Sequence, residues 1–263
     1  MTLIPVDWDA LRASLDDNAQ LLARLLRQAS ARAKDKVPGL DWTVSDLGAH
    51  LVTEPRRFDR FGRGVVEPLT DTAALNRSEL EAITETDPAK QADIFMAEHA
   101  SYMTQARKHK GTDPYQWFGV PMEWSQGAGI YLGELCIHAL DLSRLLGEKW
   151  SMSREDALAV IAGLLPILPR FVDPQAAEGF TGTFRLKLRK GPTVVLSFDE
   201  GAVTVAGSDG QRADCVINAD PASFLLVGYG RISQWGPIAR GRLLAAGRKP
   251  WLALRFSKLL VNP

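Results

Sequence analysis

The sequence predicts an α+β protein, with an N-terminal helical bundle followed by a smaller C-terminal α+β domain. Apolar residues recur at helical spacing through about the first 170 residues. After Pro174 the pattern changes to short runs rich in β-branched residues, some alternating apolar with basic side chains. The boundary is expected between 171 and 178, which gives a bundle over residues 1–172 and a second domain over residues 173–263.

The first expected helix covers residues 7–34 and ends at the breaker Pro38-Gly39. A second helix is expected to start at Ser45, whose side chain can cap it, with Asp46 in its first turn. Pro55 should bend, end or restart this helix, because proline removes one backbone hydrogen bond and clashes with the preceding turn. A third helix is predicted over residues 88–110.

Residues 115–124 are aromatic and are predicted to form a loop. They are interpreted either as a hydrophobic plug over the end of the bundle or as a lid that contacts substrate. A fourth helix is expected over residues 126–146 despite three glycines, which close packing or close approach of a ligand would explain. Ser153 opens a further helix that stops near residues 166–169.

Four strands are predicted in the second domain, and their spacing favours antiparallel hairpins. They cover residues 183–189, 193–198, 202–205 and 214–218. From Asp220 onward the apolar spacing becomes helical again.

Composition excludes several classes of protein. The 31 basic and 31 acidic residues balance, which argues against a general nucleic-acid binder. Cys136 and Cys215 lie too far apart for a CxxC metal clip, and two cysteines make no disulfide framework. We find no signal-peptide pattern and no apolar run of membrane-spanning length, so a cytoplasmic location is expected.

Residues after Asp220 include seven basic and no acidic side chains. Such a stretch is most often a solvated face, but it can also line a pocket for a carboxylate, a phosphate or a lipid head group. The basic residues are Arg231, Arg240, Arg242, Arg248, Lys249, Arg255 and Lys258.

Glu134 and His138 lie four residues apart in an expected helix, so their side chains share one face. His50, in another expected helix, is the best third partner among the four histidines. Two histidines and one carboxylate with an open position form the ligand set of a catalytic zinc or a non-haem iron site. The alternative is a buried histidine that is satisfied by a carboxylate one turn away.

Each of these histidines has a further carboxylate nearby in sequence, because Asp46 precedes His50 by one turn and Asp141 follows His138 by three residues. These carboxylates are expected to orient the second ring nitrogens of the two histidines. Their alternative roles are a helix-terminus charge for Asp46 and an inter-helix hydrogen bond for Asp141. His99 and His109 lie in a polar stretch and are predicted to face solvent.

Two motifs carry a family resemblance. Residues 41–51, DWTVSDLGAHL, and residues 134–142, ELCIHALDL, resemble paired motifs of the DinB-like family typified by mycothiol-dependent maleylpyruvate isomerase. The resemblance implies a divalent metal, usually zinc, bound by His50, Glu134 and His138 inside a four-helix bundle. It also implies a sterol-carrier-like C-terminal domain, whose Arg231 would be catalytic and would bind the cofactor or substrate. Such isomerases often have arginine in the turn before the metal glutamate, where this chain has Tyr131-Leu-Gly133.

The implied activity is that of a zinc-dependent isomerase or thiol S-transferase, in which mycothiol or a similar thiol attacks a small electrophile. Two alternatives stay open: a lipid- or acyl-binding carrier, and a metal-dependent hydrolase of the same fold. Arg231 has a further interpretation, as a helix-terminal arginine that pairs with the bundle. Cys136 lies off the ligand face, so core packing is favoured over a catalytic role.

Overall fold

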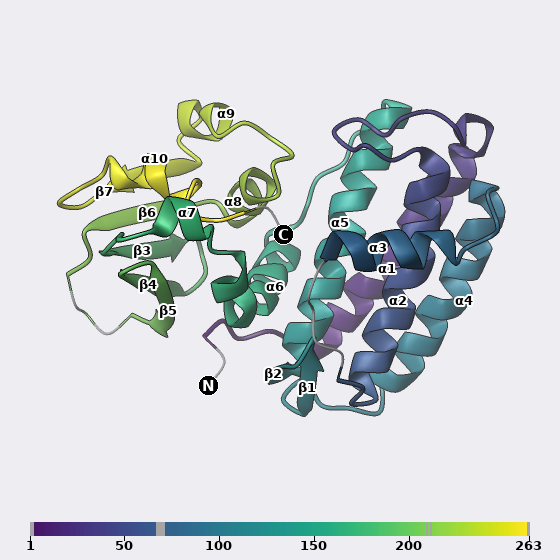
Figure 1. The fold of residues 1–263 in the computed structure, drawn as a ribbon, viewed down its shortest axis with the longest axis horizontal. Helices are drawn as coiled ribbons and strands as arrows, with labels where there is room; N and C mark the ends of the chain where they lie inside the picture. The colour runs from purple at the N-terminus through teal and green to yellow at the C-terminus, as the bar shows by residue number, and fades with distance from the viewer. Residues whose placement is uncertain (1–2, 67–71, 209, 211, 262–263) are drawn as a thin grey trace. The chain divides into compact units, whose positions relative to one another are not determined.

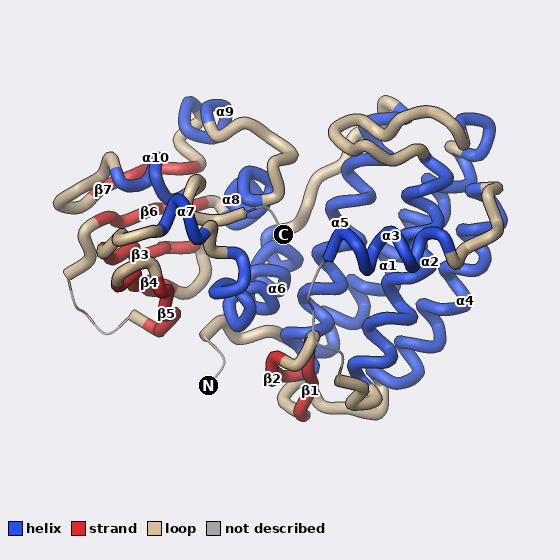
Figure 2. The backbone as a smooth tube through the Cα atoms, viewed as in Figure 1, coloured by secondary structure: helices blue, strands red, loops and turns tan. Residues whose placement is uncertain are grey.

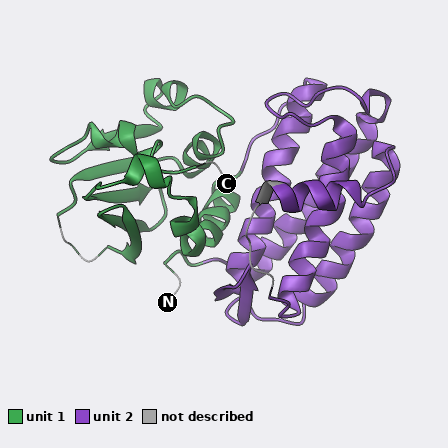
Figure 3. Ribbon diagram, viewed as in Figure 1, with its two compact units in different colours: residues 1–5, 153–263 green, residues 6–152 purple. Residues whose placement is uncertain are grey.

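A computed structural model of the protein describes residues 3–66, 72–208, 210 and 212–261. The chain divides into two units, one of residues Val6–Met152 and one of Met1–Pro5 with Ser153–Pro263 (Figure 3). This division falls before the boundary predicted at residue 172, because α6 (Arg154–Leu164) packs against α8 (Pro221–Gly228) of the C-terminal unit. Helices and strands are both present, as Figure 2 shows, so the α+β class is confirmed.

Four long helices build the N-terminal unit, and each packs against two others to close a bundle (Figure 1). The helices α1 and α2 both contact α4 and α5. Their bounds are α1 (Trp8–Gln28), α2 (Val44–Gly62), α4 (Pro88–Ala106) and α5 (Trp124–Leu146). All four were predicted, the first from its apolar spacing and the others with the help of capping and breaker residues. The short helices η1 (Ser30–Arg32) and α3 (Thr72–Glu81) were not predicted, and α3 lies against α2.

The start of α2 differs from the prediction that Ser45 caps it. Thr43 is the N-cap, because its side chain accepts from the Asp46 N–H while the Asp46 carboxylate accepts from the Thr43 N–H, a capping box. The Ser45 hydroxyl instead donates to the Thr86 carbonyl. Pro55 lies inside α2 and does not end it, since buried side chains such as Phe58 continue the apolar face beyond the proline.

Residues 114–123 form a hairpin, so the prediction of a loop is wrong. Strands β1 (Pro114–Trp117) and β2 (Val120–Glu123) pair antiparallel, with Trp117 opposite Val120. Phe118 and Gly119 between them both have positive φ, as a two-residue type I′ turn requires. The ring of Tyr115 is buried and its hydroxyl donates to the Phe58 carbonyl, which ties the hairpin to α2.

The C-terminal unit is built on a five-stranded sheet in the order β5-β4-β3-β6-β7. Its strands are β3 (Gly182–Leu188), β4 (Thr193–Asp199), β5 (Ala202–Gly207), β6 (Cys215–Ala219) and β7 (Leu243–Ala246). The first four were predicted, but β7 was not. The pairing of β3 with β6 is parallel, which differs from the predicted all-antiparallel hairpins.

Short helices complete the C-terminal unit, and the predicted cap of α6 is confirmed because the Ser153 hydroxyl accepts from the Asp156 N–H. The remaining helices are η2 (Leu165–Phe171), α7 (Pro174–Ala177), α9 (Trp235–Ala239) and α10 (Leu252–Phe256). Among the helices of the described residues, none is long and apolar enough to cross a membrane.

Candidate metal centre

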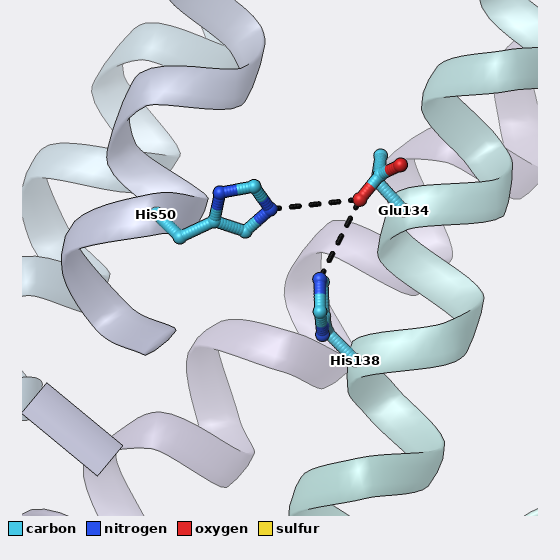
Figure 4. A group of neighbouring side chains, drawn as sticks. All are labelled: His50, Glu134 and His138. Atoms are coloured by element: carbon cyan, nitrogen blue, oxygen red, sulfur yellow. Dashed lines mark ion pairs between the residues drawn. The ribbon is translucent and has the colours of Figure 1, made fainter. Parts of the chain in front are cut away.

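Three predicted ligand residues come together inside the bundle, from two helices that are distant in sequence. His50 lies two turns into α2, while Glu134 and His138 lie one turn apart on α5 (Figure 4). Both histidines are buried and Glu134 is half-buried. The capping box fixes the start of α2, and Gly147 in the left-handed region ends α5, so both helices hold their ligand residues on defined turns.

The three side chains converge on one point. Glu134 Oε2 lies 3.5 Å from His50 Nε2 and 3.5 Å from His138 Nε2. One donor atom from each residue lies within 4.8 Å of the other two. A tetrahedron with metal–ligand bonds of ~2.0–2.1 Å has edges of ~3.4 Å, so two of the three spacings already match those of a zinc site.

Asp141 contacts His138, the histidine that it is expected to orient. Its Oδ2 lies 3.2 Å from His138 Nδ1, and the carboxylate is fully buried. Because an ionised carboxylate can only accept, Nδ1 carries a proton and Nε2 is the nitrogen presented to Glu134. Burial lowers the pKa of His138, but the hydrogen bonds of Asp141 and then Glu134 outweigh it and raise the pKa to about 9.

The two histidines shift the pKa of Glu134 strongly. Burial acts to raise its pKa, yet hydrogen bonds from His138 and then His50 lower the pKa well below its ordinary value. Glu134 is therefore an anion at neutral pH, which is the form that binds a divalent cation.

A second carboxylate, Glu54, borders the centre and was missed by the sequence analysis. It lies one turn after His50 on α2, is almost fully buried, and places Oε1 3.7 Å from His50 Nε2. Arg57 binds it at 2.7 Å and also bonds Asn76 and Glu79 of α3. Burial raises the pKa of Glu54, and Arg57 and His50 offset this only in part.

Trp42 covers one side of the two histidines. Its ring centroid lies 4.8 Å from that of His50 and 6.4 Å from that of His138. Trp42 is part of the first sequence motif, but no role was assigned to it. An aromatic wall on this side limits access of water to the donor atoms, which strengthens electrostatic interactions there.

The structure contradicts the predictions for Asp46 and His99. The Asp46 carboxylate is used in the capping box, and His50 Nδ1 has no hydrogen-bond partner within the described part of the chain, so Asp46 does not orient His50. His99 is buried between Tyr131 and Asp16, so its predicted exposure is wrong. His109 is half-buried and stacks on Trp124 at 4.5 Å.

Two other residues considered in the sequence analysis, Cys136 and Arg231, are not part of the three-residue cluster. Cys136 lies on α5 between Glu134 and His138, and Arg231 is distant in sequence. Cys136 is buried and its thiol contacts Asn18 at 3.6 Å, as expected for core packing. Arg231 belongs to the C-terminal unit, is half-buried, and donates to the Tyr229 carbonyl at 3.0 Å. Its contribution to the centre stays a prediction.

The donor set suits a divalent transition metal. Two imidazole nitrogens and one carboxylate oxygen are ligands that zinc accepts in catalytic sites. The buried Asp141 supplies the carboxylate that commonly supports a metal-binding histidine. The residues present therefore fit the metal that the sequence motifs imply.

Comparisons with known proteins agree with the two-part architecture. Residues 11–143 match the family described as "Mycothiol maleylpyruvate isomerase N-terminal domain", and residues 167–261 match the "SCP-2 sterol transfer family". No curated protein sequence matches the chain.

Two solved structures of a mycothiol-dependent maleylpyruvate isomerase, one of them a point mutant, share the fold. Each is 15% identical to the chain with a TM-score of 0.58, covering 92% of this chain and 93% of the other. At that identity the likeness concerns the fold. Since the family match spans half of the sequence and includes both motifs, the chain belongs to the mycothiol-dependent maleylpyruvate isomerase family.

Proposed function

We propose that the protein binds one divalent metal, zinc in preference to iron, through His50, Glu134 and His138, and that it is a thiol-dependent enzyme. The observation that carries the proposal is the convergence of three donor atoms within 4.8 Å from two helices of the bundle. When bound, the metal supplies positive charge that stabilises a thiolate at neutral pH.

The chain's own residues prepare this centre. Asp141 keeps His138 Nε2 turned toward Glu134, and the Nε2 proton must leave before that nitrogen can ligate. Glu134 is already ionised. Glu54, held by Arg57, adds a carboxyl group beside His50; burial raises its pKa, and a bound cation would favour its ionised form, which adds negative charge next to that cation.

The nucleophile of the proposed reaction is an external low-molecular-weight thiol, with mycothiol favoured by the family. Both protein cysteines are buried, and burial raises the pKa of Cys215, which makes it a poor nucleophile. The external thiol adds to an electrophilic carbon of a small substrate. Rotation about the resulting single bond and loss of the thiol give an isomerase, whereas a stable adduct gives a thiol S-transferase.

Arg231 is proposed to hold a carboxylate of the substrate or of the thiol cofactor. Its planar guanidinium can bind both carboxylate oxygens at once, which lysine cannot do. This role rests on the family's pattern of a Gly-Arg pair after a C-terminal helix, here Gly230-Arg231 after α8.

The direct test is metal content of the purified protein and of His50→Ala and His138→Ala. We expect one metal per chain in the wild type and loss of the metal in both variants. His109→Ala is the matched control. This histidine follows the C-terminal end of α4, is half-buried, and belongs to no ligand cluster among the described residues. Full metal content in His50→Ala and His138→Ala overturns the assignment.

The thiol requirement needs a second assay. Turnover should depend on both the metal and the thiol, and a chelator should abolish it until zinc is added back; isomerisation of maleylpyruvate is followed by the loss of the substrate isomer, because the thiol is released again, and S-transfer to other electrophiles is followed by consumption of the thiol. Turnover that continues without any thiol favours the metal-dependent hydrolase instead.

A second candidate function concerns the C-terminal unit, which contains a cavity of about 450 Å³. Its lining is almost entirely apolar, including Leu186, Leu196 and Ile217 from the sheet and Ile161 from α6. Ligand pockets commonly have volumes of ~300–1,000 Å³. This observation favours binding of an acyl chain or a similar apolar ligand, and a fluorescent fatty-acid probe tests it. Leu196→Trp should fill the cavity and abolish probe binding without loss of metal.

A further inference from the structure

The exposed apolar side chains of the protein are concentrated on the C-terminal unit. Of the eight large apolar side chains that are exposed in the described residues, six belong to this unit and two, Val65 and Val66, follow α2. The six are Trp235, Ile238, Leu244, Trp251, Leu254 and Val261. Scattered exposed apolar residues are ordinary, but contiguous ones mark an interaction surface.

These six residues are contiguous because all of them line the same cavity, and we call them the apolar rim. They come from one C-terminal stretch of the chain, residues 235–261, which holds α9, β7, α10 with its N-cap Trp251, and the segment after α10. Trp235 is 62% exposed and Trp251 is 63% exposed, although indole rings normally bury most of their area in a folded protein. The cavity therefore opens through a mouth whose edge is itself apolar.

Basic side chains accompany the rim on the same short elements. Arg240 directly follows α9, Arg242 precedes β7, and Arg255 and Lys258 belong to or follow α10; all four are exposed. Arg248 and Lys249 contribute less, because they bind Asp214. After Asp220 the sequence has no acidic residue that would neutralise this charge.

We propose that the apolar rim docks on the surface of a lipid bilayer that carries anionic head groups. Tryptophan prefers the boundary between head groups and acyl chains, where its ring is apolar and its N–H stays hydrated. Arginine and lysine around it are attracted to the negative surface potential of such a membrane. A soluble protein partner would need complementary shape, whereas a bilayer accepts a ring of indole and aliphatic side chains around an open cavity.

Docking of this kind is peripheral, since the described part of the chain offers no helix that crosses a membrane. The rim belongs to the C-terminal unit, whereas the three proposed metal ligands belong to the other unit. The mouth would face the acyl-chain region, which gives the cavity direct access to apolar molecules dissolved in the bilayer.

Co-sedimentation of the full-length protein with vesicles tests the proposal. We expect binding to vesicles of equal parts phosphatidylcholine and phosphatidylglycerol, and little binding to phosphatidylcholine alone. The double variant Trp235→Ala, Trp251→Ala should reduce the partition coefficient at least tenfold. Arg240→Glu with Arg242→Glu should reduce it roughly fivefold or more per residue, and added salt should weaken wild-type binding.

Val66→Ala and Lys34→Glu are the matched controls, because each removes an exposed apolar or basic side chain from the other unit and should leave partitioning unchanged. Unchanged melting temperatures establish that every variant is folded. The proposal is overturned if the wild type fails to bind the anionic vesicles, or if the rim variants bind as the wild type does. A wild-type dimer that the tryptophan variant converts to monomer also overturns it, since the rim would then face a second copy.

Discussion

Replacing Asp141 with asparagine should weaken metal binding by about 10- to 100-fold, or about 1.4–2.7 kcal/mol. The structural reason is the contact of 3.2 Å between Asp141 Oδ2 and His138 Nδ1, made where Asp141 has no exposed surface. A hydrogen bond to a charged group is worth about 1.5–3 kcal/mol, which is the same range. Asparagine keeps the size of the side chain but loses the charge that holds the imidazole.

The pH dependence separates this loss from a general defect. Burial lowers the pKa of His138, but Asp141 and Glu134 raise it to about 9 in the metal-free protein, so below that pH a metal must displace a proton. Apparent wild-type affinity should therefore rise about tenfold per pH unit toward pH 9. In Asp141→Asn the His138 pKa falls, the proton competes less at pH 7, and the affinity gap to the wild type should widen between pH 7 and 8.5.

The assay is competition for zinc with a chromogenic chelator across that pH range. Asp46→Ala is the control, because Asp46 also lies within about one turn of a ligand histidine in sequence but serves the capping box of α2. It should lower stability by about 0.5–2 kcal/mol and leave zinc affinity unchanged. The reasoning fails if Asp141→Asn binds zinc as tightly as the wild type, or if Asp46→Ala loses affinity to the same extent.

Four further changes test other parts of the structure. Burial lowers the pKa of His99 below its ordinary value, so stability should fall as pH drops below about 6.5; His99→Gln should flatten that slope in thermal melts, and an unchanged slope would contradict the assignment. The double variant Cys136→Ser, Cys215→Ser should still turn over an electrophile when an external thiol is supplied; its inactivity with metal and fold intact would point to a protein nucleophile. Arg231→Lys should lose most activity with unchanged metal content, and full activity would remove the carboxylate-clamp role. Glu54→Gln should weaken zinc binding about tenfold in the chelator assay, because a carboxylate near the cation is removed; equal affinity would make Glu54 a purely structural partner of Arg57.

The long helices of the bundle were predictable because apolar spacing, capping residues and breakers mark them in the sequence, whereas the shortest elements were not. Strand β7 has only four residues, Leu-Leu-Ala-Ala, with no alternation to mark a buried face. The β1–β2 hairpin turns at Phe118-Gly119, which lacks the Asn-Gly or Asp-Gly signal of most type I′ turns. The parallel pairing of β3 with β6 depends on contacts distant in sequence, and no local pattern encodes it.

His99 shows where a usable signal was overlooked. Its sequence neighbours are polar, so it was predicted to face solvent. Helical spacing instead places it four residues after Phe95 and three before Tyr102, both fully buried on α4. The periodicity of the helix decides which face a residue occupies, and the polarity of adjacent residues does not.

The ligand cluster was predictable from spacing and motif order, but the surrounding carboxylates required the structure. Asp46 and Asp141 look equivalent in sequence, each within one turn of a ligand histidine. Only the structure shows that Asp46 is committed to Thr43 at the helix start, while Asp141 lies mid-helix with no capping role. A carboxylate in the first turn has unpaired N–H groups to satisfy, so this choice follows from helix-end chemistry.

Glu54 is the more instructive omission, because the rule that identified Glu134 and His138 applies to it as well. His50 and Glu54 are also four residues apart on one helix, with the order of acid and base reversed. The spacing alone could not show that Glu54 would be buried. Burying an unpaired carboxylate costs several kcal/mol, so a glutamate without a known partner is expected to be exposed. Its burial is stabilised by Arg57, which in turn needs Glu79 from α3, a helix that carries little apolar signal of its own. The carboxylate beside His50 therefore depends on a charge network that closes only when α3 packs against α2, and this dependence links the environment of the metal centre to a peripheral helix.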